Sequence, residues 1–168
     1  FGHDIICLDN NQDKIKNLKE GIVPIFEPGL SDLILKNRDA GRLNFTTDLK
    51  QAVEVADVVM IAVGTPSRDR DGQADISYVM QALEDVAPHL KSNAVVVTKS
   101  TVPVGTTRKM GHKLKELRPS LSFSLASNPE FLREGSAIGD FMRPDRVVVG
   151  HSDAHAKAVM GQVYRPLF

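Results

Sequence analysis

The stretch Ala94–Gly105, AVVVTKSTVPVG, shows how this chain folds. Its first five residues are apolar or β-branched without alternation, which is typical of a strand buried on both faces inside a parallel sheet. The proline and glycine that follow indicate a turn. The next segment, residues 106–117, is predicted to be a helix. A strand, a turn and a helix in this order form the repeating unit of α/β domains.

The same alternation runs along the whole chain. Val/Ile-rich runs predict buried strands at 4–9 and 57–63, and further strands at 43–47, 123–127 and 146–150. Helices are predicted at 11–21, 30–38, 48–56, 76–90, 106–117 and 153–164, and a polar loop at 64–75. The fold class is therefore α/β, a doubly wound, Rossmann-like parallel sheet, and no connection offers a domain boundary.

Composition narrows the functional classes. The chain has 168 residues, with 21 basic and 21 acidic side chains, so its net charge is zero. This balance argues against a surface for nucleic acid or anionic lipid, and no apolar run approaches the length of a membrane span. The only cysteine, Cys7, allows no internal disulfide and no cysteine zinc cluster. A reducing, cytoplasmic location fits, with Cys7 as a small buried hydrophobe.

Polar residues collect after the predicted strands. Asp9, the GTP of 64–66, the STVPVG of 100–105 and the NPEFLREG of 128–135 each follow a strand. Ligands bind at the carboxyl ends of such strands, so these segments are expected along one edge of the sheet. The last one also has a local interpretation, because Asn128, Pro129 and Glu130 are common residues at a helix start. The shared edge favours a ligand site.

Asp9 indicates which nucleotide would bind. An acid at the end of the second strand of a dinucleotide fold can accept hydrogen bonds from the adenosine ribose, and its charge repels a ribose phosphate, so NAD is favoured over NADP. Lys14, one turn further on, could reach the same ribose, or it could simply be solvated. The alternative for the acid is that Asp9 or Asn10 caps the next helix.

One element of a dinucleotide fold is not found in the sequence. The glycine-rich turn and the strand that should precede Asp9 are absent from the residues given. We therefore expect that the first strand of the fold is missing, and that it would lie between 4–9 and 57–63. These two strands should then not be hydrogen-bonded to each other.

A possible metal site can be weighed from spacing. His151 and His155 stand four residues apart, with Asp153 between them. The segment begins a helix, where Ser152 and Asp153 make good caps, and no zincin glutamate follows the first histidine. We predict no metal site.

Five motifs together identify a family. They are EPGL at 27–30, GTPS at 64–67, STVPVGTT at 100–107, NPEFLREGSAI at 128–138 and RPDRVVVG at 143–150. With these motifs the chain resembles, over its whole length, the N-terminal NAD-binding domain of the UDP-glucose/GDP-mannose dehydrogenase family. The resemblance implies that residues 1–168 are this domain truncated at both ends, without the central and C-terminal nucleotide-sugar domains. It also implies a homo-oligomer assembled through the absent central region.

The resemblance also implies roles for individual residues. Asp9 and Lys14 would hold the adenosine ribose of NAD. Thr65 and Thr101 would line the NAD site, with Glu134 near the nicotinamide end. The backbone from Glu130 to Glu134 would touch the substrate, through Glu130, Phe131, Leu132, Arg133 and Glu134. The nucleophilic thiol of the family, with its helper lysine and aspartate, lies beyond residue 168, and Cys7 does not match that thiol.

The implied reaction is the four-electron oxidation of UDP-glucose to UDP-glucuronate, a precursor for polysaccharide biosynthesis, with two NAD⁺. Its last step needs a base to activate the water that meets a thioester, and a carboxylate beside an apolar group suits this task. Glu130, next to Phe131, could be that base, and Thr101 could orient the water or merely form a turn. Arg133 could pair with Glu134 or Glu130, or be solvated.

Two other functions stay open. A sister enzyme would act on GDP-mannose or a UDP-N-acetylhexosamine, although RPDRVVVG and FEPGL favour the UDP-glucose branch. A different class is a non-catalytic dinucleotide-binding module. Such a module needs Asp9 but has no use for Glu130 and Thr101 placed together.

Overall fold

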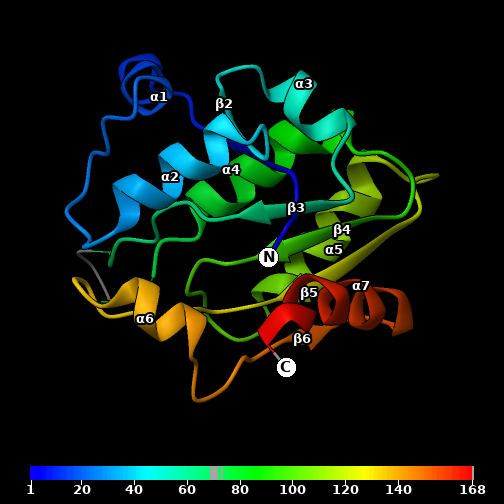
Figure 1. Cartoon of the computed structure of the whole chain (residues 1–168). Coiled ribbons are helices and arrows are strands. Elements are labelled where there is room, and N and C mark those ends of the chain that lie inside the picture. Colours follow the sequence, from blue (N-terminus) through cyan, green and yellow to red (C-terminus); the bar gives the residue numbers. More distant parts are fainter. Residues whose placement is uncertain (69–71, 73, 168) are drawn as a thin grey trace. The chain divides into compact units, whose positions relative to one another are not determined.

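The computed structural model describes residues 1–68, 72 and 74–167, so residues 69–71 and 73 of the predicted polar loop lie outside the described part. Contacts within the chain define two compact units (Figure 1). The first unit comprises Phe1–Ala52, Phe131–Arg146 and the C-terminal residues from Val163. The second unit comprises Val53–Glu130 and Val147–Gln162.

The first unit contains a two-stranded parallel sheet. Strand β1 (Ile5–Leu8) pairs with β2 (Leu43–Thr46), with Cys7 opposite Phe45. The unit also contains three helices, which are α1 (Gln12–Lys19), α2 (Leu30–Asp39) and α6 (Ala137–Met142). Ile15 and Phe45 are its buried apolar side chains on α1 and β2. Helix α1 buries Ile15, leaves Leu18 half-buried and ends before Gly21, whose φ of +85° only glycine adopts readily.

Strand β1 is less buried than its sequence predicts. Ile5, Ile6 and Leu8 are 45%, 38% and 37% exposed. The reason is that β1 pairs only with β2 among the described residues, so its other edge has no neighbouring strand. The expectation that β1 does not pair with the 57–63 strand is confirmed, because these strands belong to different sheets.

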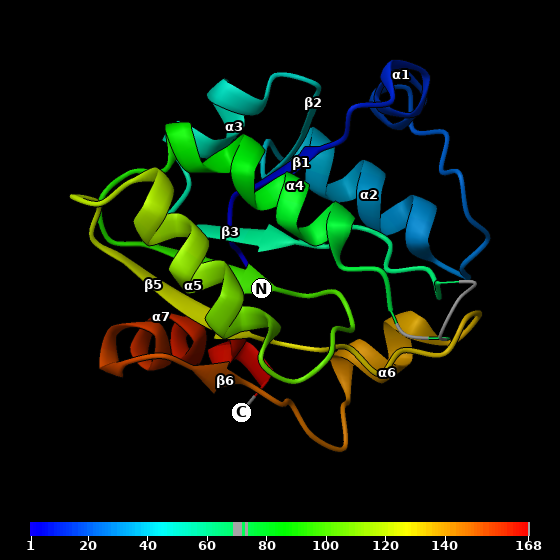
Figure 2. The ribbon, with the colours of Figure 1, turned by 180° about the vertical axis from the view of Figure 1, so that it is seen from behind.

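The second unit is built on a four-stranded sheet in the order β3 (Val58–Ile61), β4 (Ala94–Thr98), β5 (Phe123–Ser127) and β6 (Gly150–His151). Helices α4 (Ser77–Val86) and α5 (Thr106–Leu117) lie on the face of the sheet that is turned toward the viewer in Figure 2. A short 3₁₀ turn, η1 (Ala87–His89), contains Pro88 and ends α4. Helices α3 (Leu49–Glu54) and α7 (Ala154–Tyr164) each have residues in both units, and the 3₁₀ turn η2 (Arg165–Leu167) belongs to the first unit.

Strand β4 forms the centre of the core. All five of its residues are fully buried between β3 and β5, in parallel register with both strands. Leu83 of α4 and Met110 of α5 are also fully buried. Thr98, the one polar residue of β4, donates its hydroxyl hydrogen bond to the Met110 sulfur at 3.2 Å, so its burial leaves no unsatisfied donor.

The predicted strand at 146–150 is mostly wrong. Only Gly150 and His151 form a strand, and it runs antiparallel to β5, not parallel. The cause lies in the preceding residues, where the Asn128 side chain donates to the Val148 carbonyl at 2.9 Å. The Val148 carbonyl is therefore hydrogen-bonded to a side chain and not to the N–H of a neighbouring strand.

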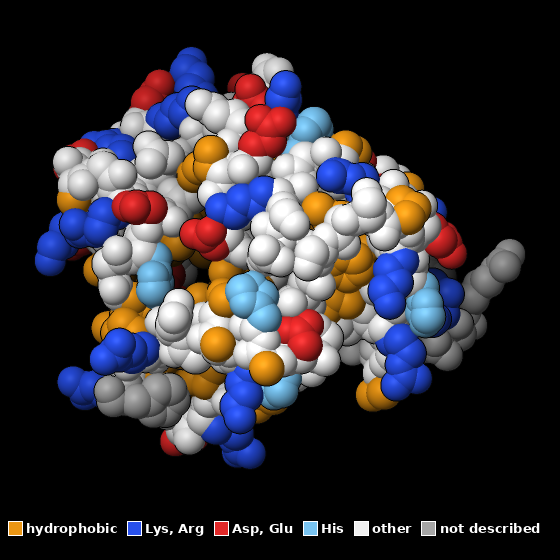
Figure 3. Space-filling view, turned by 90° about the vertical axis from the view of Figure 1, so that its right-hand side faces the viewer, with side chains coloured by type: hydrophobic (Ala, Val, Ile, Leu, Met, Phe, Trp, Pro, Cys, Tyr) orange, Lys and Arg blue, Asp and Glu red, His pale blue; other side chains and the backbone are white. Residues whose placement is uncertain are grey.

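The surface carries charges of both signs. Basic and acidic side chains are interspersed over the face shown in Figure 3, in keeping with equal numbers of the two. None of the helices in the described part of the chain is long and apolar enough to cross a bilayer.

The buried contact of α4 with the sheet can be tested by truncation. Leu83→Ala should lower the free energy of unfolding by about 2–5 kcal/mol, because it removes a fully buried side chain and leaves a cavity. Leu117→Ala, at a position 42% exposed on α5, is the matched control and should cost much less. Urea unfolding of both variants measures the difference, and equal losses would contradict this description of the core.

Candidate functional site

Three predicted site residues share one edge of the sheet in the second unit. Thr65, Thr101 and Glu130 follow β3, β4 and β5, and these strands are parallel, so their carboxyl ends meet at that edge. The parallel pairing bears out the predicted shared edge for the ends of β3, β4 and β5, whereas the place of Asp9 and Glu134 on that edge stays a prediction. Asp9 and Glu134 belong to the first unit.

Side chains tie together the loops after β3 and β4. The Thr65 hydroxyl donates to the Thr101 carbonyl at 3.0 Å, and the Ser100 hydroxyl donates to the Val63 carbonyl at 2.6 Å. The turn that follows is completed by Gly105, which has a φ of +89° directly before α5. Thr101 thus takes part in a turn through its carbonyl, while its side chain stays exposed.

The segment after β5 is not a helix start. Residues 128–136 contain no helix, and α6 begins only at Ala137, so the local interpretation of Asn128, Pro129 and Glu130 is wrong. Asn128 is instead buried at 1% exposure. Its backbone N–H donates to the Thr98 carbonyl at 2.9 Å, and its side chain bonds Val148. These bonds fix the chain where it leaves β5, two residues before Glu130.

Lys99, for which the sequence predicted no role, directly follows β4. Its half-buried ammonium donates to the Asn128 Oδ1 at 3.4 Å. Burial lowers the pKa of Lys99, and the negative charge of Glu130 acts in the opposite direction. The edge therefore holds a cation near the predicted base. Phe131 is 65% exposed and Glu130 is exposed, so the apolar enclosure expected for this carboxylate is not present among the described residues.

Asp9 ends β1 with both carboxylate oxygens engaged. Oδ2 accepts from the Lys14 ammonium at 2.6 Å, and Oδ1 accepts from the Asn11 N–H at 2.9 Å. The hydrogen bond from Lys14, then that from Asn11, lowers the pKa of Asp9, so the carboxylate is charged at neutral pH. The cap of α1 is Asn11, which accepts from the Lys14 N–H, so neither Asp9 nor Asn10 is the cap.

The pair formed by Asp9 and Lys14 is accessible and offers both acceptors and donors of hydrogen bonds. The Asp9 side chain is 28% exposed and that of Lys14 is 43% exposed, so a ligand can reach both. The carboxylate offers acceptors to two hydroxyl groups, and the ammonium offers donors. Asp9 and Lys14, which were predicted as two separate candidates, therefore form one ion pair.

Arg133 has a partner that was not predicted. Its guanidinium donates to both carboxylate oxygens of Asp140, at 3.0 Å from Nε and 2.7 Å from Nη2, and not to Glu130 or Glu134. The Arg133 backbone N–H donates to the same Asp140 oxygen as Nε. The side-chain hydrogen bonds from Arg133 lower the pKa of Asp140 to about 2.

The cysteine and the residues weighed as metal ligands have structural explanations. Burial raises the pKa of the Cys7 thiol, so the reactive thiolate is disfavoured. Asp153 accepts from the Ala156 N–H at 2.8 Å at the start of α7, and His155 contacts the Asn93 carbonyl at 3.0 Å. Within the described ranges, His, Cys, Asp and Glu side chains form no group of three that could hold a metal ion.

Parallel strands joined by helices, an acid at the end of β1 and polar loops at the carboxyl ends of β3, β4 and β5 define a Rossmann-like dinucleotide-binding domain. The sequence matches the NAD binding domain of the UDP-glucose/GDP-mannose dehydrogenase family over residues 1–168. The chain belongs to this family.

Individual relatives agree with this assignment. The chain is 56% identical, over 170 aligned residues and its whole length, to a UDP-glucose 6-dehydrogenase of Rhizobium meliloti, of which it spans 39%. A UDP-glucose dehydrogenase structure from Pyrobaculum islandicum superposes with a TM-score of 0.94 at 40% identity, covering 99% of this chain and 39% of the other. A GDP-mannose dehydrogenase from Pseudomonas aeruginosa gives a TM-score of 0.92 at 34% identity, covering 98% and 39%.

The charge pair at the end of β1 predicts a change in cofactor preference. In the full-length protein, Asp9→Asn should raise the use of NADP⁺ relative to NAD⁺ about tenfold or more, because charges 4 Å apart near a surface interact by roughly 1–4 kcal/mol. The released Lys14 ammonium would add attraction for the ribose phosphate. The ratio of kcat/KM for the two cofactors measures the change. Asp13→Asn, in the first turn of α1, is the control, and an unchanged ratio in Asp9→Asn would exclude the role.

Proposed function

We propose that this chain is the NAD-binding part of a UDP-glucose 6-dehydrogenase, an NAD-dependent oxidoreductase that converts UDP-glucose to UDP-glucuronate in a four-electron oxidation. One observation carries the proposal. Thr65, Thr101 and Glu130 stand together at the carboxyl edge of the sheet in a chain that is 56% identical to an enzyme of that name. A domain that only binds a dinucleotide has no need for an exposed carboxylate directly after β5.

The residues divide into two tasks. For the cofactor, Asp9 and Lys14 bind the adenosine ribose, Thr65 and Thr101 line the site, and Glu134 lies near the nicotinamide end. NAD⁺, when bound, accepts the hydride in each of the two oxidations. Its other contacts would come from the glycine-rich turn of such folds, which the present residues do not include.

For the chemistry, Glu130 acts as the general base. It takes a proton from a water held by the Thr101 hydroxyl, the water oxygen bonds to the thioester carbonyl carbon, and the carbon–sulfur bond breaks to release a thiolate and the carboxylic acid, which loses its proton to solvent. The thiol itself comes from the part of the protein beyond residue 168. The backbone of residues 130–134, from Glu130 through Phe131, Leu132 and Arg133 to Glu134, contacts the nucleotide sugar.

We also propose that the whole protein is a cytoplasmic homo-oligomer that provides UDP-glucuronate for polysaccharide biosynthesis. Cys7, the lone cysteine of these 168 residues and partly buried, suits a reducing compartment. The second candidate substrate is GDP-mannose or a UDP-N-acetylhexosamine, supported by the TM-score of 0.92 with a GDP-mannose dehydrogenase. The 56% identity to a UDP-glucose enzyme favours UDP-glucose.

A direct assay separates these substrates. The full-length protein is mixed with NAD⁺ and one of UDP-glucose, GDP-mannose or a UDP-N-acetylhexosamine, and NADH is followed by absorbance. UDP-glucose should give the highest kcat/KM, with two NADH formed for each UDP-glucuronate. Preference for another sugar would assign the protein to a sister enzyme. NAD⁺ binding without turnover of any of the three would indicate a non-catalytic module.

The role of Glu130 predicts a specific loss. Glu130→Gln in the full-length protein should lower kcat for UDP-glucose by about 10²–10⁴-fold, the usual contribution of a general base. The KM for NAD⁺ should change little. Glu116→Gln, an exposed acid on α5, is the control. A loss confined to the KM for NAD⁺ would make Glu130 a binding residue instead.

A further inference from the structure

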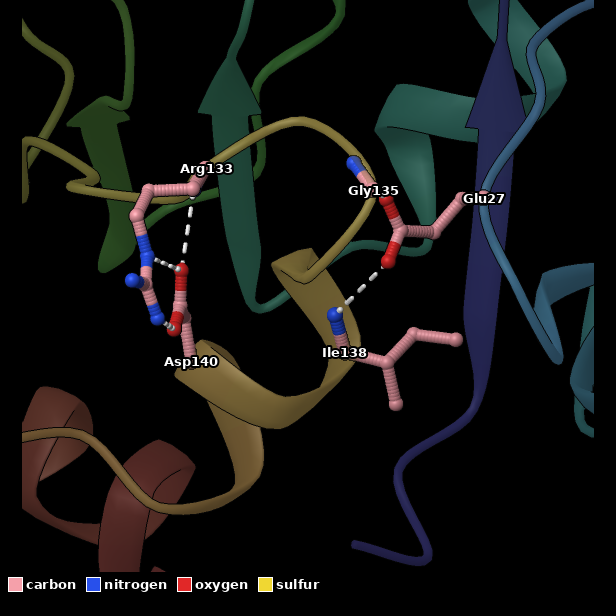
Figure 4. Close-up of polar contacts among 5 residues, drawn as sticks. All are labelled: Glu27, Arg133, Gly135, Ile138 and Asp140. Carbon is pink, nitrogen blue, oxygen red and sulfur yellow. Dashed lines mark hydrogen bonds and ion pairs between the residues drawn. The ribbon is translucent and has the colours of Figure 1, made fainter.

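The segment after Glu130 is held from a distant part of the chain. Glu27 lies in the loop between α1 and α2, 108 residues from Gly135 in sequence, yet its Oε2 accepts from the Gly135 N–H at 2.8 Å. Its Oε1 accepts from the Ile138 N–H at 3.4 Å (Figure 4). All of these residues belong to the first unit. The Glu27 carboxylate therefore accepts one hydrogen bond from each of these two backbone amides, one on each oxygen.

A second carboxylate holds the same segment from within. Asp140 accepts the backbone N–H of Arg133 and two hydrogen bonds from its guanidinium, which Figure 4 shows lying alongside the carboxylate. The Asp140 side chain is 19% exposed, whereas that of Arg133 is 79% exposed. Asp140 is therefore the less exposed partner of this ion pair.

The backbone between these contacts forms a closed turn. The Ser136 N–H donates to the Arg133 carbonyl at 3.0 Å, and the Asp140 N–H donates to the Ser136 carbonyl at 3.0 Å. Gly135 has a φ of +79°, a conformation that side-chain-bearing residues rarely adopt. Phe131 and Glu134 remain exposed beside this turn. The backbone is fixed while the side chains expected to face ligands stay accessible.

We propose that Glu27 and Asp140 are positioning residues that hold the segment Phe131–Glu134 in the shape that binds the nucleotide sugar. The inference rests on the proposed function for the identity of the ligand. Neither carboxylate needs to touch that ligand. Hydrogen bonds to a charged acceptor are about twice as strong as neutral ones. The bonds to Glu27 and Asp140 can therefore order this surface segment before the ligand binds. Binding then costs less conformational entropy.

The test uses full-length protein with the variants Glu27→Ala and Glu27→Gln. Glu27→Ala should raise the KM for UDP-glucose roughly tenfold, since small displacements of a positioning segment cost about 10–100-fold. The KM for NAD⁺ should change much less than the KM for UDP-glucose, because Glu134 is the one proposed cofactor residue within this segment, whereas Asp9, Lys14, Thr65 and Thr101 lie outside it. Glu27→Gln should recover part of the loss, because its carbonyl oxygen still accepts from Gly135. Asp32→Asn, an exposed acid in the first turn of α2, is the matched control.

Hydrogen exchange gives a readout that does not depend on substrate. Peptides that contain Gly135 and Ile138 should exchange faster in Glu27→Ala than in the wild type or in Asp32→Asn. Unchanged exchange, or faster exchange with an unchanged KM for UDP-glucose, would overturn the proposal. Parallel losses for both substrates together with a lower Tm would also overturn it, because they indicate general destabilisation.

The two proposals can fail separately. If the wild-type protein does not oxidise UDP-glucose, the proposed function is wrong. The KM comparison is then made with whichever nucleotide sugar is oxidised. If none is oxidised, the exchange rates alone decide, and unchanged protection of residues 133–138 in Glu27→Ala refutes the positioning role.

Discussion

The complete burial of β4 is the constraint on which the second unit depends. A strand with no exposed residue must have a strand on each side and cover on both faces, and β3, β5 and the helices α4 and α5 provide most of this. Because β3, β4 and β5 are parallel, their carboxyl ends fall at one edge. Thr65, Thr101 and Glu130 are brought together by that geometry, although 65 residues of sequence separate the first from the last.

The candidate site is then shaped by side chains that bond to backbone. Ser100 holds the end of β3, Thr65 holds the turn after β4, and Asn128 holds the end of β5. Strand ends leave peptide groups without ladder partners, and each of these contacts satisfies such a group. The same contacts limit how far the loops can move. Rigid loops at a sheet edge are the usual arrangement for catalytic and binding residues.

The first unit uses charge for the same purpose. Lys14 neutralises Asp9 at the end of β1, and Arg133 pairs with Asp140. Sequence reasoning found the first pair as two separate candidates and missed the second. Local patterns predicted β4, β5 and α5 well, because apolar runs and helical spacing record burial directly. They failed at 146–150. This segment has the same apolar composition, but the Val148 carbonyl accepts a hydrogen bond from the Asn128 side chain in place of one from a neighbouring strand.

The sequence by itself determined the order of the strands and helices up to β5, the parallel direction of these strands and the placement of Asp9, Thr65, Thr101 and Glu130 directly after strands. These features depend on neighbours in the chain, so a local pattern records them. Only the tertiary structure decided the exposure of β1, the absence of a helix at Asn128, and the bonds of Lys99 with Asn128 and of Glu27 with Gly135. The physical reason is that these bonds join residues 29 and 108 positions apart. Any exposed lysine or glutamate looks the same in sequence until folding selects its partner.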